Sequence, residues 1–190
     1  MPDRHIALLR GINVGRAKRV AMADLRALVE ALGYRDVQTL LNSGNVIFGG
    51  VTGASRAVAA RIEAEVAARL GVSSRVTVLS AAELTAAIAN NPFGEIAHDP
   101  SRLLVTFLND SADGTRLAPL TQQNWSPEAL AVESRFAYLW CPPGIIASRL
   151  APAVNSVLRD AATARNWATV IKLHALATAQ TAPLQGRQKR

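Results

Sequence analysis

The sequence contains one cysteine, Cys141, and only 5% aromatic residues. A single cysteine cannot form a disulfide within the chain, and it lacks the second thiol of a cysteine metal pair. A reducing compartment fits this cysteine usage best. The apolar run near the N-terminus, Ile6 to Leu9, is far too short for a signal-peptide core or a membrane span. We therefore expect a cytoplasmic protein with no membrane partner.

Charged residues are also scarce, at 18%, whereas hydrophobic residues make up 49% of the chain. This is the composition of a folded globular protein, with a largely aliphatic core and alanine-rich helices. A length of 190 residues allows one or two small domains.

The net charge of +7 is unevenly distributed along the chain. The first 133 residues hold 13 basic and 13 acidic side chains, whereas the rest hold eight basic residues against Asp160 alone. A one-sided field of this kind attracts phosphates and other anions. However, arginine outnumbers lysine 18 to 3, which favours a compositional bias as the origin of the excess charge.

The first half of the chain predicts the order strand, helix, strand, strand, helix, strand. Apolar residues at helical spacing follow the first strand, and the short strands 37–41 and 46–48 flank Asn42-Ser43-Gly44-Asn45. These small polar residues and the glycine are typical of a tight hairpin turn. Ser80 and Glu83 have the spacing of a capping box at the start of a third helix.

The second half repeats this order less cleanly, with strands 103–108, 130–133 and 136–141 and a last helix near Trp167. Together the two halves predict an α+β fold of two ferredoxin-like (split βαβ) halves, with antiparallel or mixed sheets and helices packed on one face. We place the first half at residues 1–90, the second at 91–180, and a flexible tail at 181–190.

Four short motifs resemble the family of domains of unknown function numbered 1697. They are, in order, Ala7-Leu8-Leu9-Arg10-Gly11-Ile12-Asn13-Val14-Gly15, Asn42-Ser43-Gly44-Asn45-Val46, Asn90-Asn91-Pro92-Phe93 and Arg165-Asn166-Trp167. The resemblance extends from about His5 to Ala177. It implies a bacterial α+β protein with ferredoxin-like halves and no settled activity, and it supplies no catalytic residues.

The main candidate site is the basic, glycine-containing loop 10–19, which connects a strand to a helix. Glycines allow backbone N–H groups to turn toward a ligand, and a helix start favours anions. The glycine spacing matches neither a dinucleotide fingerprint nor a P-loop. The candidate anion ligands are Arg10, Gly11, Asn13, Gly15, Arg16, Lys18 and Arg19, joined by Ser43 and Asn45 from the hairpin turn. The alternative is that the glycines shape a turn, the arginines are solvated and the hairpin residues serve the turn.

A second candidate consists of basic and polar residues around a tryptophan: Arg165, Asn166, Trp167 and Lys172. An indole beside cations can stack on and neutralise a nucleotide, but Trp167 at helical spacing with Val170 and Ile171 is more often part of a core. The three histidines are scattered, so we expect no metal site and no cofactor. Catalytic residues cannot be assigned.

Three functions remain open at this point. The first is a binding protein for a phosphorylated or otherwise anionic ligand, either a nucleotide or nucleic acid, through loop 10–19. The second is an enzyme that acts on a small anionic metabolite, and the third is a structural or self-associating protein. The sequence is compatible with either a monomer or a homodimer.

Overall fold

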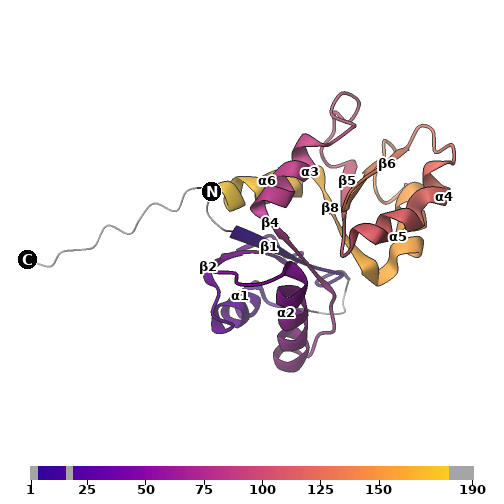
Figure 1. Cartoon of the computed structure of the whole chain (residues 1–190). Helices are drawn as coiled ribbons and strands as arrows, with labels where there is room; N and C mark the ends of the chain where they lie inside the picture. The colour runs from indigo at the N-terminus through magenta and orange to yellow at the C-terminus, as the bar shows by residue number, and fades with distance from the viewer. Residues whose placement is uncertain (1–3, 16–18, 180–190) are drawn as a thin grey trace, which may run out of the picture.

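The computed structural model of the chain describes residues 4–15 and 19–179. Within them, the chain forms two four-stranded sheets, one from each half (Figure 1). The first sheet has the order β2-β3-β1-β4 and the second the order β6-β7-β5-β8. Every strand pairing in the described residues is antiparallel. The same strand order thus occurs twice, and the predicted α+β class is confirmed.

The first repeat contains β1 (Arg4–Leu9), α1 (Met22–Ala31), β2 (Arg35–Leu40), β3 (Asn45–Gly49), α2 (Ser55–Leu70) and β4 (Val76–Ser80). The second repeat contains β5 (Leu103–Leu108), the 3-10 helix η1 (Ser111–Leu117), α4 (Ala118–Thr121), β6 (Ala129–Glu133), β7 (Phe136–Trp140), α5 (Leu150–Leu158), the 3-10 turn η2 (Arg159–Ala161) and β8 (Ala162–Asn166). Each repeat is followed by one more helix, α3 (Ala81–Ala89) or α6 (Trp167–Thr178).

Local sequence signals explain several of these boundaries. The predicted hairpin turn lies between β2 and β3, and Gly44 in it has a φ of 75°. An added Cβ at Gly44 would lie 2.7 Å from Ile12 Cδ1, so both the backbone and the packing require glycine there. The predicted capping box begins α3: Ser80 Oγ accepts a hydrogen bond from the Glu83 N–H, and the Glu83 carboxylate accepts one from the Ser80 N–H.

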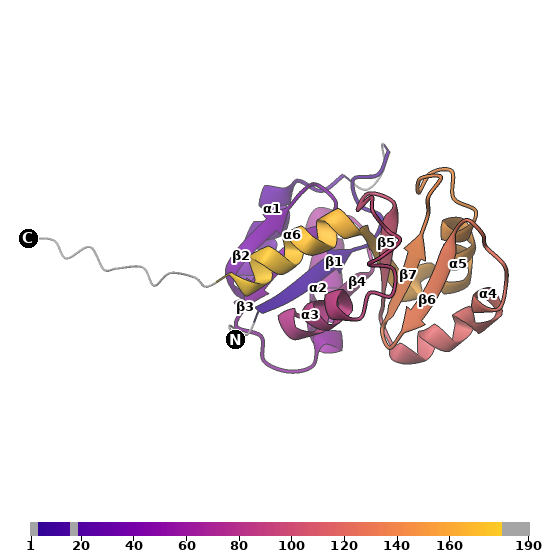
Figure 2. The same ribbon diagram turned by 90° about the horizontal axis from the view of Figure 1, so that it is seen from above.

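Both faces of the first sheet are buried. Because successive residues of a strand point to opposite faces, Ala7 and Leu9 join a core with α1 and α2, whereas Ile6 and Leu8 join a second core. This second core is shared with α3, α6 and the second sheet, and Figure 2 shows α6 lying across the first sheet. Helices α1 and α2 therefore pack on one face of the first sheet and α3 and α6 cover the opposite face, so the expected placement of helices on one face alone does not hold for this sheet.

The end of the second repeat differs from the sequence-based expectation, which gave only a last helix near Trp167 there. Arg165 and Asn166 instead end β8, a strand to which no residues had been assigned. Helix α6 begins at Trp167, and Asn166 is its N-cap because its side-chain oxygen accepts a hydrogen bond from the Thr169 N–H at 3.0 Å. The strand Ala162–Asn166 is short and contains no valine, isoleucine or aromatic residue, so its composition gives little indication of a strand.

The two repeats are closely joined. Besides the shared core, α6 contacts strands of both sheets, and Arg4 Nη1 donates to the Leu176 carbonyl at 2.9 Å. The division of the chain between residues 90 and 91 stays a prediction, and the expected tail at 181–190 lies outside the described residues. In the part of the chain that the structure describes, no helix combines the length and the apolar character needed to cross a membrane.

Candidate functional site

A groove of about 530 Å³ lies where the loop after β1, the β2–β3 turn and the β8–α6 junction meet. Five of the residues proposed from the sequence line it, namely Arg10, Gly11, Ser43, Arg165 and Asn166. The two candidate sites, which lie far apart in the sequence, therefore come together in space. This convergence depends on β8 pairing with β5 beside the first repeat.

Arg165 lies in the wall of this groove and is 9% exposed. Its guanidinium donates to Asn45 Oδ1 at 2.5 Å and to the carbonyl oxygens of Leu9 and Ser43 at 2.8 and 2.9 Å, all in the first repeat. Its two remaining N–H groups donate to β8 itself. Burial lowers the pKa of Arg165 to about 10, so the side chain is still charged at neutral pH.

The positive charge of Arg165 has no carboxylate partner among the described residues. All five guanidinium N–H groups are bound to neutral oxygens. Arg165 thus joins the two repeats and leaves an uncompensated charge beside the groove, but it has no donor left for a ligand.

Arg10 is the second cation of the groove, and 26% of its side chain is exposed. It reaches from the first repeat into the second: Nη1 donates to the Ala162 carbonyl at 2.7 Å and Nη2 to Asn155 Oδ1 at 2.6 Å. Its Nε lies 3.6 Å from Asp160 Oδ1. Each terminal nitrogen keeps one N–H that no described residue accepts, so Arg10, unlike Arg165, can still donate to a ligand.

The two asparagines proposed as ligands stabilise loops instead. Asn13, with a φ of 56°, donates to the carbonyls of Val20 and Asn42, both at 2.8 Å, and accepts from the Val20 N–H at 2.9 Å. Asn45 is fully buried, donates within its own hairpin and accepts from Arg165. Neither side-chain amide is available to a ligand in this arrangement.

The loop after β1 forms the outer rim of the groove. Gly11 and Gly15 have φ values of 63° and 62° with open space around them, so their role there is to turn the chain. Between them, Val14 is 71% exposed and lines the groove, as does Ile145 from the second repeat. The rim is therefore partly apolar.

The other proposed residues contribute less. Arg19 and Lys172 are exposed, but neither is among the described residues that line the groove. Arg16 and Lys18 lie outside the described residues. Trp167 packs against the core shared by the two sheets, in agreement with the alternative weighed from its spacing.

Neither a cluster of metal ligands nor a reactive cysteine is found among the described residues. No cluster of three or more histidine, cysteine, aspartate or glutamate side chains could hold a metal ion there. Cys141 is buried, and burial raises the pKa of its thiol, which makes it a poor nucleophile.

The Cys141 thiol lies beside Glu128, whose buried carboxylate anchors the start of α5. The carboxylate accepts hydrogen bonds from the Ser148 hydroxyl and from the N–H groups of Arg149 and Leu150 at 3.0 and 3.3 Å. Burial raises the pKa of Glu128, but these hydrogen bonds outweigh it, and the pKa lies below its usual value. This cluster is therefore structural.

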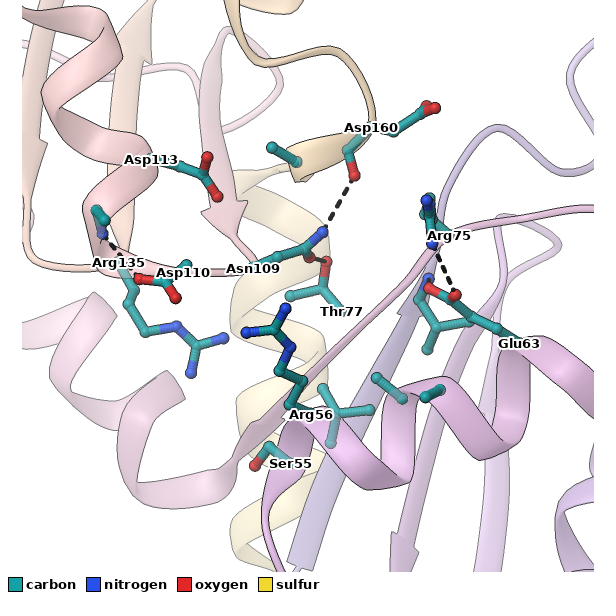
Figure 3. A pocket seen from close by; sticks show the side chains of 16 residues that line it. Ser55, Arg56, Glu63, Arg75, Thr77, Asn109, Asp110, Asp113, Arg135 and Asp160 are labelled. Atoms are coloured by element: carbon teal, nitrogen blue, oxygen red, sulfur yellow. Dashed lines mark hydrogen bonds and ion pairs between the residues drawn. The ribbon is translucent and has the colours of Figure 1, made fainter.

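A larger cavity, of about 680 Å³, lies elsewhere between the repeats (Figure 3). Its walls come from α2 and β4 of the first repeat and from the segment after β5 in the second. None of the site residues proposed from the sequence lines it. The sequence feature that could have indicated this cavity is the position of Asn109 and Asp110 directly after β5, which corresponds to that of Arg10 and Gly11 after β1 in the first repeat.

The repeated β-α-β-β-α-β order and the joined sheets define an α+β protein built from two similar units. The chain belongs to the family described as "Protein of unknown function (DUF1697)", whose model matches residues 3–138. Its structure is similar to that of the conserved bacterial protein SP0830 from Streptococcus pneumoniae, with a TM-score of 0.76 and 23% sequence identity over 92% of this chain and 98% of that one. At this identity the likeness establishes the fold. No curated protein matches the sequence.

Proposed function

We propose that the protein binds a small anionic ligand, such as a nucleotide or another phosphorylated compound, in the groove beside Arg10 and Arg165. One observation carries the proposal: two guanidinium groups, and no carboxylate, are among the described residues that line this groove. An anion there meets attraction from both cations, and most strongly from Arg165, whose charge is shielded from water.

The two arginines have different roles in this proposal. Arg165 supplies charge without contact because all its donors are occupied, whereas Arg10 supplies up to two direct hydrogen bonds. The apolar rim at Val14 and Ile145 suits a ligand with a nonpolar part, such as a base or a ring. A groove of about 530 Å³ is in the size range of small-molecule sites, about 300–1,000 Å³.

The experiment is calorimetric titration of AMP and of inorganic pyrophosphate into the wild type and two variants. Arg10→Gln removes the groove donor, and Arg26→Gln removes an exposed arginine of α1 that pairs with Glu30 at 2.8 Å, so the two variants have the same net charge. We expect saturable binding by the wild type and by Arg26→Gln, and about tenfold weaker binding by Arg10→Gln, equivalent to about 1.4 kcal/mol. Equal affinities in the two variants, or no saturable binding of either probe, would refute the proposal.

Nucleic acid is the alternative source of the same phosphate chemistry, and a second titration distinguishes it. Labelled single-stranded RNA is titrated at several salt concentrations. Binding that is tighter than that of AMP and falls steeply with salt indicates counterion release along a strand. Affinity for AMP that changes little with salt, without RNA binding, supports a small ligand.

The proposal includes a cytoplasmic, bacterial protein whose halves are each ferredoxin-like. The single buried cysteine supports the location, and the identical strand order in both sheets supports the description of the halves.

A further inference from the structure

The larger cavity between the repeats differs from the groove in its charges. The described residues that line it include three arginines and four carboxylates, namely Arg56, Arg75, Arg135, Glu63, Asp110, Asp113 and Asp160. A ligand that carries only negative charge would meet more carboxylates than cations here. This cavity therefore suits a different class of ligand from the groove.

Most of these charges are already neutralised by partners within the protein. The ion pairs are Arg75 with Glu63 at 3.2 Å, Arg135 with Glu83 at 2.5 Å, Asp113 with Arg116 at 3.0 Å and Asp160 with Arg10 at 3.6 Å. Arg135 is further committed to the Leu108 carbonyl, to which two of its nitrogens donate. These side chains form the walls of the cavity, and their charges are largely balanced by their partners before a ligand binds.

Two charged side chains stay uncommitted, and they belong to opposite repeats. Arg56, in the first turn of α2, has no hydrogen bond or ion pair within residues 4–15 and 19–179. The carboxylate of Asp110, the N-cap of η1, accepts a single hydrogen bond, from the Ala112 N–H at 2.9 Å. Figure 3 shows Arg56 extending from α2 into the space between the repeats and Asp110 on the opposite wall. No ion pair between Arg56 and Asp110 is formed in the described structure.

Between these two walls, a neutral hydrogen-bonded bridge joins the repeats. Thr77 Oγ1 donates to Asn109 Oδ1 at 2.7 Å, and Asn109 Nδ2 donates to the Asp160 carbonyl at 3.1 Å. This bridge holds β4 next to the segment after β5, so the backbones that carry Arg56 and Asp110 face each other across the cavity.

We propose that this cavity binds a small zwitterion, such as an amino acid or a short peptide. Arg56 takes the carboxylate, for which its planar guanidinium offers two parallel N–H groups, and Asp110 takes the ammonium group. The ligand completes a charge pair that the protein leaves open across the interface, and it links the two repeats when it binds. This site is distinct from the anion groove proposed above, and the ion pair of Arg10 with Asp160 lies between the two.

The test uses glycine, 4-aminobutyrate and 6-aminohexanoate, which are zwitterions of increasing charge separation. Each is titrated into the wild-type protein by calorimetry, together with its N-acetyl and methyl-ester derivatives, which lack one of the two charges. We expect one member of the series to bind best, because the backbones that carry the two charges are held on facing walls, and both of its derivatives to bind at least about tenfold more weakly.

Three variants assign the binding to the cavity. Arg56→Gln removes the cation, and Asp110→Asn removes the negative charge but keeps an oxygen for the Ala112 N–H. Arg69→Gln, in the last turn of the same helix, removes an exposed arginine that pairs with Glu65 at 2.6 Å and serves as the control. We expect binding to weaken about tenfold or more in the first two variants and to stay unchanged in the control.

Folding of all three variants is checked by circular dichroism and thermal unfolding. Arg56→Lys, which keeps the charge but loses the two parallel donors, should bind with intermediate affinity. The proposal is overturned if no zwitterion of the series binds saturably, if a singly charged derivative binds as tightly as its parent, or if Arg56→Gln binds like Arg69→Gln. AMP binding in the groove should be the same in Arg56→Gln as in the wild type, which separates this result from that of the groove.

Discussion

Replacing Arg165 by methionine should destabilise the protein strongly, although the residue forms no ion pair among the described residues. The change removes the donors to Asn45 Oδ1 and to the carbonyls of Leu9 and Ser43, at 2.5, 2.8 and 2.9 Å. Each hydrogen bond to a charged group contributes about 1.5–3 kcal/mol. Methionine has a similar length and fills most of the same space.

Two effects offset part of this loss. The buried cation no longer has to be desolvated, and water can enter through the open groove to reach the exposed acceptors. We therefore expect a net loss of about 3 kcal/mol in the free energy of unfolding. For a chain of this size, that corresponds to a decrease of about 6–12 °C in Tm. Arg165→Lys, which keeps the charge with fewer donors, should lose about half as much.

Urea unfolding at pH 7, followed by circular dichroism and analysed by linear extrapolation, measures the effect. Arg69→Gln is the control, because its exposed ion pair is worth less than about 1 kcal/mol. If Arg165→Met unfolds at the same urea concentration as Arg69→Gln, the hydrogen bonds of Arg165 do not hold the repeats together and the reasoning fails.

Gly44→Ala should destabilise the protein by about 3 kcal/mol for two reasons. An alanine would be strained at the positive φ of this position, and its methyl group would lie 2.7 Å from Ile12 Cδ1 and 2.8 Å from Leu9 Cβ. Gly71→Ala, with a φ of 65° but open space, should lose only about 1 kcal/mol; similar unfolding midpoints for the two variants would contradict the packing argument. Glu128→Gln should be less stable than the wild type at pH 7 by about 2 kcal/mol. Since the pKa of Glu128 in the folded state lies below its usual value near 4.5, this stabilisation is complete above that value and is lost as the pH falls through the folded-state pKa. Urea unfolding between pH 7 and pH 3 should therefore show the difference between the two proteins shrinking, and a difference that grows on acidification would refute the assignment.

Much of the architecture followed from local patterns. The hairpin at 42–45 and the capping box at Ser80 and Glu83 are each decided by residues close in sequence. Such signals depend on backbone angles and short-range hydrogen bonds, which are determined by the types of residue at neighbouring positions. The strand β8 was not predicted from the sequence, because its pairing with β5 makes it a strand and its own residues do not indicate one.

The individual roles of the candidate site residues could not be predicted in this way. Arg10 and Arg165 were proposed as anion ligands because of their charge, and both do line one groove. Every donor of Arg165 is occupied, whereas Arg10 keeps two free donors. This difference depends on carbonyl groups that the opposite repeat places next to each guanidinium. The pairing of Arg56 with Asp110 could not be foreseen, because their shared feature is the absence of an ion-pair partner within the described structure.

By itself, the sequence determined the order of most elements, several of the turns and caps between them and the membership of the family, since these rest on residues that are neighbours along the chain. The tertiary structure decided which charges are satisfied and which stay open. Charge satisfaction depends on contacts across the interface between the repeats, and these contacts join residues that are far apart in the sequence. Leu9 and Arg165, for example, are 156 positions apart.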